Sequence, residues 1–206
     1  MDKFDYREVE TAEYSTSLTP SIVELNERNY ITYHGKGKFD LSDSHFKEVI
    51  AAMYALANGI KEAASTSSKL EWFRDYEPYP LNSYWDADGS FTLMIKQPNF
   101  TIPELLSEAK DKLKSEFSPD VLDQIHFTRE EEGAEVQLIS FGQPDEDTFE
   151  KITNFIATNG LKVMGSGHRE LFLDNLLTTP IEKLRVLLRV QIAKESIGNN
   201  LAVVTN

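Results

Sequence analysis

One order of predicted elements occurs twice along this chain of 206 residues. In each half, a strand is followed by a helix and then by two further strands or extended segments. This order predicts an α+β fold in which helices cover one face of an antiparallel sheet. Two such modules in tandem are expected to be related by a pseudo-twofold axis, and the groove between them is a natural place for a ligand.

β-branched and aromatic residues predict the strands of the first module, which covers about residues 21–98. The expected extended segments are residues 21–25, 30–33, 69–76 and 90–96, with a turn at 26–29. Apolar residues spaced alternately by four and three predict one amphipathic helix over 44–64. Ser42, Asp43 and Ser44 are all competent N-caps for it.

The second module covers about residues 134–192 and follows a helical connector over about 102–122. Its expected elements are a strand at 135–141, a helix at 145–158, extended segments at 161–164 and 169–173, and a strand at 186–192. Residues 179–182 have the signature of a capped short turn. The whole chain, residues 1–206, is therefore expected to be one domain made of two modules.

Charge and composition exclude several classes of function. The chain has 34 Asp and Glu against 21 Lys and Arg, a formal net charge of −13, which disfavours nucleic acid as a partner. Its lack of cysteine excludes Cys-ligated metals and thiol catalysis and suits a reducing compartment. The N-terminus has no apolar leader and no segment is apolar over the length of a membrane span, so we expect a cytoplasmic protein without a membrane partner.

The sequence carries no motif for a metal or a cofactor. Its four histidines, at positions 34, 45, 126 and 168, are isolated and predict no dedicated metal site. The segment 34–38 lacks the spacing of a P-loop. Gly165-Ser166-Gly167 precedes a strand, whereas a nucleophile elbow leads into a helix, so a glycine-rich turn is the better interpretation.

An aromatic concentration and two polar residues are the remaining candidates for a site. Seven aromatic residues, including both tryptophans, lie between Trp72 and Phe91; they either pack on the core helix or form a cleft wall for a flat or cationic ligand. Glu170 shares one side of its strand with Phe172, either as an ordinary exposed residue or as a carboxylate that acts as a base or holds a cation. Tyr54, beside the apolar stripe of the first helix, is either a core residue or reaches the rim of a pocket.

Six segments in order resemble the stand-alone GyrI-like small-molecule-binding domains. They are residues 46–57, 80–85, 92–98, 136–142, 168–173 and 182–185. The resemblance covers about residues 21–192 and implies two strand-helix-strand-strand modules with a groove between them for bulky aromatic or cationic molecules. It also implies a buried glutamate as the ligand anchor, at the position of Glu170. Residues 175–177 stand where an Asp-Pro turn is common in that family.

Some stand-alone members of that family hydrolyse reactive cyclopropane-bearing genotoxins by opening the ring with water. For this chain the resemblance implies that Glu170 activates the water, Tyr54 assists as an acid, base or orienting group, and Trp85 stacks on the flat ligand. The other implied ligand contacts are Tyr84, Met94, Phe141, His168 and Phe172. Two alternatives stay open: a drug-binding or sensing module without catalysis, and a protein-interaction domain. The sequence predicts no oligomeric state.

Overall fold

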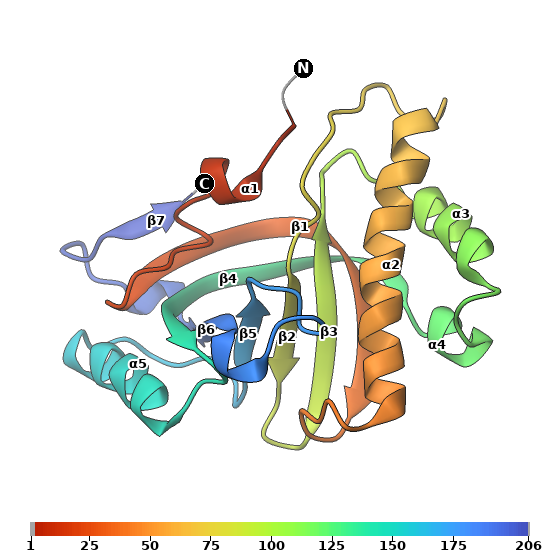
Figure 1. Ribbon diagram of the computed structural model, residues 1–206. Helices are drawn as coiled ribbons and strands as arrows, with labels where there is room; N and C mark the ends of the chain where they lie inside the picture. Colours follow the sequence, from red (N-terminus) through yellow and green to blue (C-terminus); the bar gives the residue numbers. More distant parts are fainter. Residues whose placement is uncertain (1–2, 206) are drawn as a thin grey trace.

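A computed structural model describes residues 3–205 of the chain, and its centre is a closed antiparallel sheet (Figure 1). The strands are β1 (Ser21–Lys36), β2 (Leu81–Trp85), β3 (Ser90–Gln97), β4 (His126–Phe141), β5 (His168–Phe172), β6 (Arg185–Ile192) and β7 (Val203–Thr205). They follow the order β3-β2-β5-β6-β4-β1-β7, and β3 also pairs with β1, which closes the first six strands into a barrel. Only β7 runs parallel to its neighbour, β1.

The predicted pair of strand-helix-strand-strand modules is confirmed. The helices are α1 (Tyr6–Val9), α2 (Ser44–Thr66), α3 (Pro103–Leu113), α4 (Pro119–Asp123), α5 (Glu146–Thr158) and the short 3₁₀ turns η1 (Ile181–Lys183) and η2 (Lys194–Ser196). The first module is β1-α2-β2-β3 and the second is β4-α5-β5-β6. Corresponding strands are equally long, at 16, 5 and 8 residues, so the two modules repeat one backbone plan.

Strand pairing follows the pseudo-twofold axis. The first residue of β1, Ser21, pairs with the twelfth of β4, and the first residue of β4, His126, pairs with the twelfth of β1. In the same way the third residues of β2 and β5, Ser83 and Glu170, pair with each other. Because a residue on the axis must face its own counterpart, Ser83 and Glu170 lie at the symmetry axis of the barrel.

Each module has its own helix, and each of the two helices covers a separate apolar core. Helix α2 begins at its predicted N-cap, where the Asp43 carboxylate accepts hydrogen bonds from the backbone N–H groups of His45 (2.8 Å) and Phe46 (3.2 Å). Its apolar face packs on the larger core, and α3 and α4 lie along its outer side (Figure 1). The shorter helix α5 covers the smaller core. No helix within residues 3–205 has the length and apolar character that a membrane crossing requires.

Five sequence expectations for secondary structure were wrong or incomplete. Residues 21–25 and 30–33 belong to one strand: β1 pairs with β4 across the expected turn at 26–29, and Asn26, Glu27 and Arg28 line a cavity. Residues 69–76 form a loop with one bridge, between Phe4 and Tyr76, and the segment 161–164 likewise makes a single bridge. The connector is two helices, since Ser118-Pro119 opens a new one. Strand β4 starts at His126, before the expected boundary.

Candidate functional site

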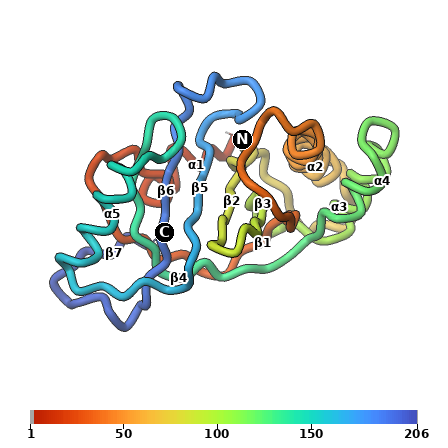
Figure 2. Tube along the Cα trace, turned by 90° about the horizontal axis from the view of Figure 1, so that it is seen from below, coloured from red at the N-terminus to blue at the C-terminus, as the bar shows by residue number. Residues whose placement is uncertain are grey.

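Glu170 lies on the helix-covered face of the sheet, between the two modules. Opposite it on β6 is Leu188, which belongs to the core under α5, and opposite its partner Ser83 is Leu93, which belongs to the core under α2. Directly opposed residues share a face of the sheet. Both views of the backbone place β5 and β2 between α5 and α2 (Figures 1 and 2). Glu170, at the symmetry axis, thus lies on the surface of the sheet between the two helices.

The two oxygens of the Glu170 carboxylate have different surroundings. Oε1 lies 3.0 Å from Nε2 of His168, whose ring is held edge-on at 4.9 Å against Phe149 of α5. Oε2 is buried and has no hydrogen-bond partner among the described residues. The residue as a whole is only 8% exposed. Leaving a buried carboxylate oxygen unpaired costs about 1–3 kcal/mol or more, so this oxygen is a group for which a ligand or water can provide a partner.

An aromatic wall adjoins the carboxylate on the side of α2. The ring of Phe172 stacks on Phe39 at 5.8 Å, and Phe39 in turn contacts Trp85 at 6.2 Å. The indole N–H of Trp85 donates to Ser83 Oγ at 2.8 Å, and Ser83 Oγ donates to the backbone carbonyl of Glu170 at 3.2 Å. These bonds fix the indole beside the axis position.

Gly35 of β1 lies against Phe91, another aromatic residue of this wall. Phe91 lies 5.0 Å from Trp85 between ring centroids. A Cβ atom on Gly35 would lie 2.3 Å from the Phe91 ring, so a larger residue at this position of β1 would require the ring to shift. The aromatic wall therefore combines residues from β2, β3, β5 and the loop before α2, and its rings pack on the core under α2.

Tyr54 flanks this region from α2. Its hydroxyl oxygen accepts a hydrogen bond from the backbone N–H of Leu176 at 3.1 Å, which ties α2 to the loop after β5. Burial raises the pKa of Tyr54 to about 12, although the Leu176 hydrogen bond acts in the opposite direction. The phenol is therefore protonated at neutral pH, and no hydrogen bond joins it to Glu170 within the described chain.

Comparison with known proteins identifies the fold. A scan of protein-family models finds no match, and a search of curated proteins finds none. Among solved structures, two crystal structures of hydrolases from Listeria innocua are similar to this chain, at 25% and 26% identity with TM-scores of 0.81 and 0.79; each match covers 93% of this chain and 100% of the other. The C-terminal domain of EcmrR matches at 13% identity and a TM-score of 0.52, covering 85% of this chain and 98% of that domain.

This chain has the GyrI-like fold. The closed sheet, the paired modules and the helix-flanked axis are the features of that fold that position the site. At the axis of this chain, one module places a serine and the other a glutamate, so the two modules are chemically different at the point where they meet.

The structure separates the other implied ligand contacts. His168 and Phe172 share the face of Glu170, and Trp85 lies beside them. Tyr84 and Met94 lie on the opposite face, where Arg169 is 5.6 Å from the Tyr84 ring and 3.2 Å from the Met94 sulfur. Phe141, at the end of β4, is 65% exposed, outside the aromatic wall. No group of three or more His, Asp or Glu side chains among residues 3–205 is placed to hold a metal ion.

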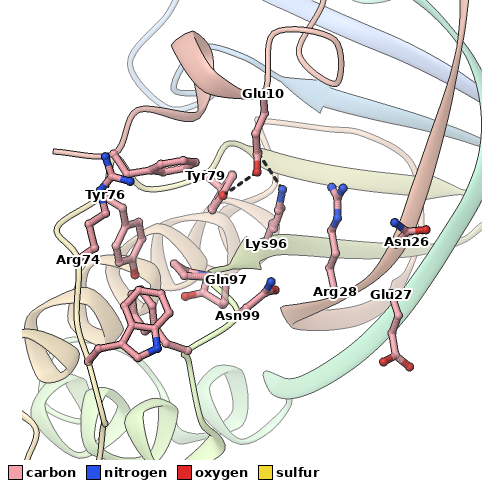
Figure 3. Close-up of a pocket in the computed structure, with 14 residues that line it drawn as sticks. Glu10, Asn26, Glu27, Arg28, Arg74, Tyr76, Tyr79, Lys96, Gln97 and Asn99 are labelled. Atoms are coloured by element: carbon pink, nitrogen blue, oxygen red, sulfur yellow. Dashed lines mark hydrogen bonds and ion pairs between the residues drawn. The ribbon is translucent and has the colours of Figure 1, made fainter. Parts of the chain in front are cut away.

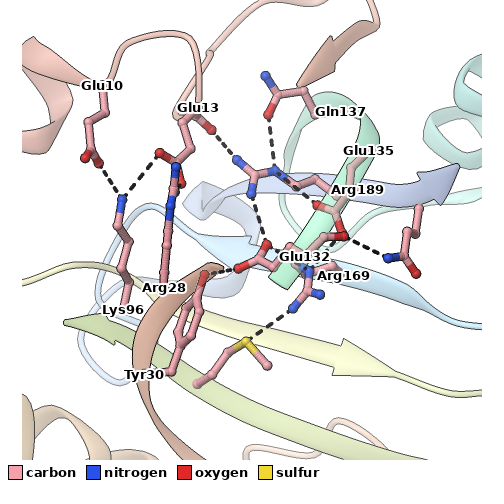
Figure 4. A network of polar contacts seen from close by, with 12 residues as sticks. Glu10, Glu13, Arg28, Tyr30, Lys96, Glu132, Glu135, Gln137, Arg169 and Arg189 are labelled. Carbon is pink, nitrogen blue, oxygen red and sulfur yellow. Dashed lines mark hydrogen bonds and ion pairs between the residues drawn. The ribbon is translucent and has the colours of Figure 1, made fainter. Parts of the chain in front are cut away.

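The interior of the GyrI-like barrel contains a buried ionic network that sequence reasoning missed (Figure 4). Its centre is formed by Glu132 and Glu135 of β4, Arg169 of β5 and Arg189 of β6, with nitrogen–oxygen distances of 3.1–3.8 Å. Tyr30 donates a hydrogen bond to Glu132. Burial alone would raise the pKa of Glu132, but the two arginine charges outweigh it and hold that pKa below its ordinary value.

Further charges extend the network to the N-terminal segment. Lys96 Nζ lies 2.8 Å from Glu10 and 3.4 Å from Glu13, and Arg28 is paired with Glu13. The network thus holds four acids and four bases. A sequence signal did exist, since charged or amide side chains occupy alternate positions in β4 (Glu135, Gln137) and β6 (Arg189, Gln191).

Proposed function

We propose that this chain is a hydrolase that binds bulky, flat, electrophilic or cationic small molecules between α2 and α5 and opens reactive cyclopropane rings with water. The observation that carries the proposal is the Glu170 carboxylate, with one oxygen oriented by His168 and the other buried without a partner. Likeness over nearly the full chain to two hydrolases at 25–26% identity supports the reaction class.

Each residue then has a defined part in the reaction. Glu170 Oε2 accepts a proton from water while the water oxygen forms a bond to a ring carbon. The strained carbon–carbon bond breaks, and its electron pair passes to the conjugated carbonyl, which becomes a phenolate. The phenolate takes up a proton from solvent and Glu170 releases its own to solvent, so the net change is the addition of one water. Tyr54, protonated with a pKa of about 12, is the hydrogen-bond donor for the phenolate oxygen. Because ring opening releases strain, orientation and one base are sufficient catalysis.

A non-catalytic binding module is the second candidate, and the aromatic wall favours it. A carboxylate beside Phe172, Phe39 and Trp85 is an arrangement that holds an aromatic cation, because ring faces and a negative charge both attract it. In that case the ligand is sequestered unchanged.

Turnover in ¹⁸O-labelled water separates the two candidates. We expect the wild-type protein to convert many equivalents of a cyclopropane-bearing electrophile into a hydrated product that carries ¹⁸O. Glu170→Gln keeps the shape of the site and removes the base, so its rate should fall by about 10²–10⁴ while ligand binding persists. Tyr54→Phe should lose less, because it removes one hydrogen-bond donor.

Glu195→Gln, at an exposed position in η2, is the matched control and should keep the wild-type rate. Stoichiometric binding without hydrated product would leave the binding module as the function. An unchanged rate in Glu170→Gln would remove Glu170 from the reaction.

A further inference from the structure

Figure 3 shows a cavity of about 460 Å³ whose lining does not include Glu170. This volume is within the range of small-molecule sites. Arg28 of β1, Lys96 of β3, the loop 72–79 and the N-terminal segment line it. Lys96 is three residues from Leu93, whose side chain shares the face of Glu170, so Lys96 points to the other side of the sheet. The cavity and the Glu170 region are therefore two different places.

Aromatic rings form one wall of the cavity. They are Phe4, Trp72, Tyr76, Tyr79 and Phe100. Trp72 contacts Phe100 edge-on, with centroids 5.0 Å apart and planes at 75°, and Trp72 is still 58% exposed. A large apolar ring left this open at the rim of a cavity offers a stacking surface for a flat ligand.

The charges of the wall are paired except for one. Lys96 is held by Glu10, and Arg28 by Glu13. Glu27, on the same wall, is held by Arg129 at 2.7 Å. Arg74 is the lining cation for which no ion pair occurs within residues 3–205. In a chain of net charge −13, this cavity thus has one surplus positive charge, and a guanidinium binds carboxylate and phosphate groups through two parallel hydrogen bonds.

The ring faces of this wall are already matched with cations of the protein. Arg74 lies 5.4 Å from the Phe4 ring, Lys61 lies 5.6 Å from the Tyr76 ring, and Lys96 lies 4.5 Å from the Tyr79 ring. Because Lys61 is paired with Asp75 and Lys96 with Glu10, the charge of Arg74 decides the preference: it repels a ligand cation and attracts an anion. The cavity therefore has the opposite charge preference to the Glu170 region.

We propose that this cavity is a second binding site, for a small planar aromatic anion. The ring of the ligand stacks on Trp72, and its carboxylate or other oxyanion pairs with Arg74. The side-chain amides of Asn26 and Asn99, which line the same wall, supply further hydrogen-bond donors (Figure 3).

Tryptophan fluorescence can measure binding at the two sites separately, because Trp72 lines the cavity and Trp85 lies beside Glu170. In Trp85→Phe, Trp72 is the only tryptophan, and its emission should change saturably with biphenyl-4-carboxylate. Biphenyl-4-methylammonium, of matched size, should bind at least about tenfold more weakly. In Trp72→Phe, the emission of Trp85 should not respond to the carboxylate.

Charge variants complete the test, in the Trp85→Phe background. Arg74→Gln should weaken carboxylate binding about tenfold or more, because a charge-assisted contact is lost. Lys151→Gln removes an exposed positive charge on α5 and should leave binding unchanged, as should Glu170→Gln. The proposal is overturned if the ammonium compound binds as tightly as the carboxylate, if Arg74→Gln has no effect, or if only Trp85 responds.

Discussion

At the scale of single residues, partners distinguish Glu170 from the other buried glutamates. Glu132 and Glu135 each lie within 4 Å of two arginines, so their charges are matched inside the barrel. Among residues 3–205, Glu170 has only His168 within such reach, through one oxygen. Three buried glutamates within residues 3–205 have an oxygen without a hydrogen bond, and in Glu170 that oxygen also has no ion pair with an arginine.

The buried arginines should be far more important for stability than exposed ones. Arg189→Met would leave Glu132 and Glu135 with half of their positive partners, and removing one member of a buried ion pair costs about 3–5 kcal/mol. We expect a loss of this size in the free energy of unfolding measured in urea. Arg129→Met removes a 67% exposed arginine paired with Glu27 and should cost less than about 1 kcal/mol. Equal losses in the two variants would contradict the role assigned to the network.

At the scale of elements, local signals predicted the helices better than the strands. The N-cap Asp43 and the apolar spacing of α2 are properties of neighbouring residues, and the helix begins where they predict. The polar residues 26–29 have the composition of a turn, but they lie in the middle of β1. Their partners, such as Glu13 for Arg28, come from distant segments, and a single sequence does not place those segments.

Strand β2 shows the same limit. Its sequence, LNSYW, has polar residues at two successive positions and was not expected as a strand. Ser83 is buried there because it pairs with Glu170 and binds its backbone, a contact that exists only once the second module has folded against the first.

The glycine-rich turn before β5 is a close-packed element that a mutation can test. A Cβ atom on Gly167 would lie 2.4 Å from the Trp85 carbonyl oxygen and 2.5 Å from Tyr84 Cζ. Gly167→Ala should therefore push β5 from β2 and cost about 1–3 kcal/mol of stability, as overpacking does. The neighbouring Ser166→Ala, which loses one hydrogen bond to Asp86, should cost less than about 1 kcal/mol. Unfolding in urea measures both, and a neutral Gly167→Ala would show that the turn has room.

At the scale of the whole molecule, the inner face of the barrel is charged, whereas the outer face, which the helices cover, is apolar. In the interior, ion pairs join strands of the second module to one another and join the first module to the N-terminal segment, with four acids matched by four bases. The helix-covered face is apolar, except that Ser83 and Glu170 lie at the symmetry axis. Since the network is neutral as a whole, the net charge of −13 belongs to the remainder of the chain.

The aromatic concentration between residues 72 and 91 illustrates how far sequence could locate the site. The segment was expected to form either one cleft wall or one core hairpin. The barrel instead divides it: Trp85 and Phe91 lie by the axis, whereas Trp72, Tyr76 and Tyr79 line the cavity on the other side. Composition identified the residues, but only the closure of the sheet assigns them to two places.

Buried tyrosines should make the molecule sensitive to alkali. Seven of the eight have pKa values raised by burial, to about 12 for Tyr6 and Tyr54. In the unfolded chain tyrosine ionises at about pH 10. A raised folded pKa gives stability that is complete below the unfolded value and is lost as pH rises through the folded one.

We therefore expect the urea midpoint to fall above about pH 10, with phenolate absorbance appearing together with the loss of circular dichroism. Titration of most tyrosines near pH 10 in a protein with native circular dichroism would contradict the burial of these phenols.

A crystal structure of Glu170→Gln with an uncleaved cyclopropane-bearing ligand would test the central claim most directly. The account predicts ligand density between α2 and α5, with its flat ring against Trp85 and a water between its reactive carbon and the side chain of residue 170. Ligand density only in the cavity beside Trp72, or away from residue 170 altogether, would contradict it.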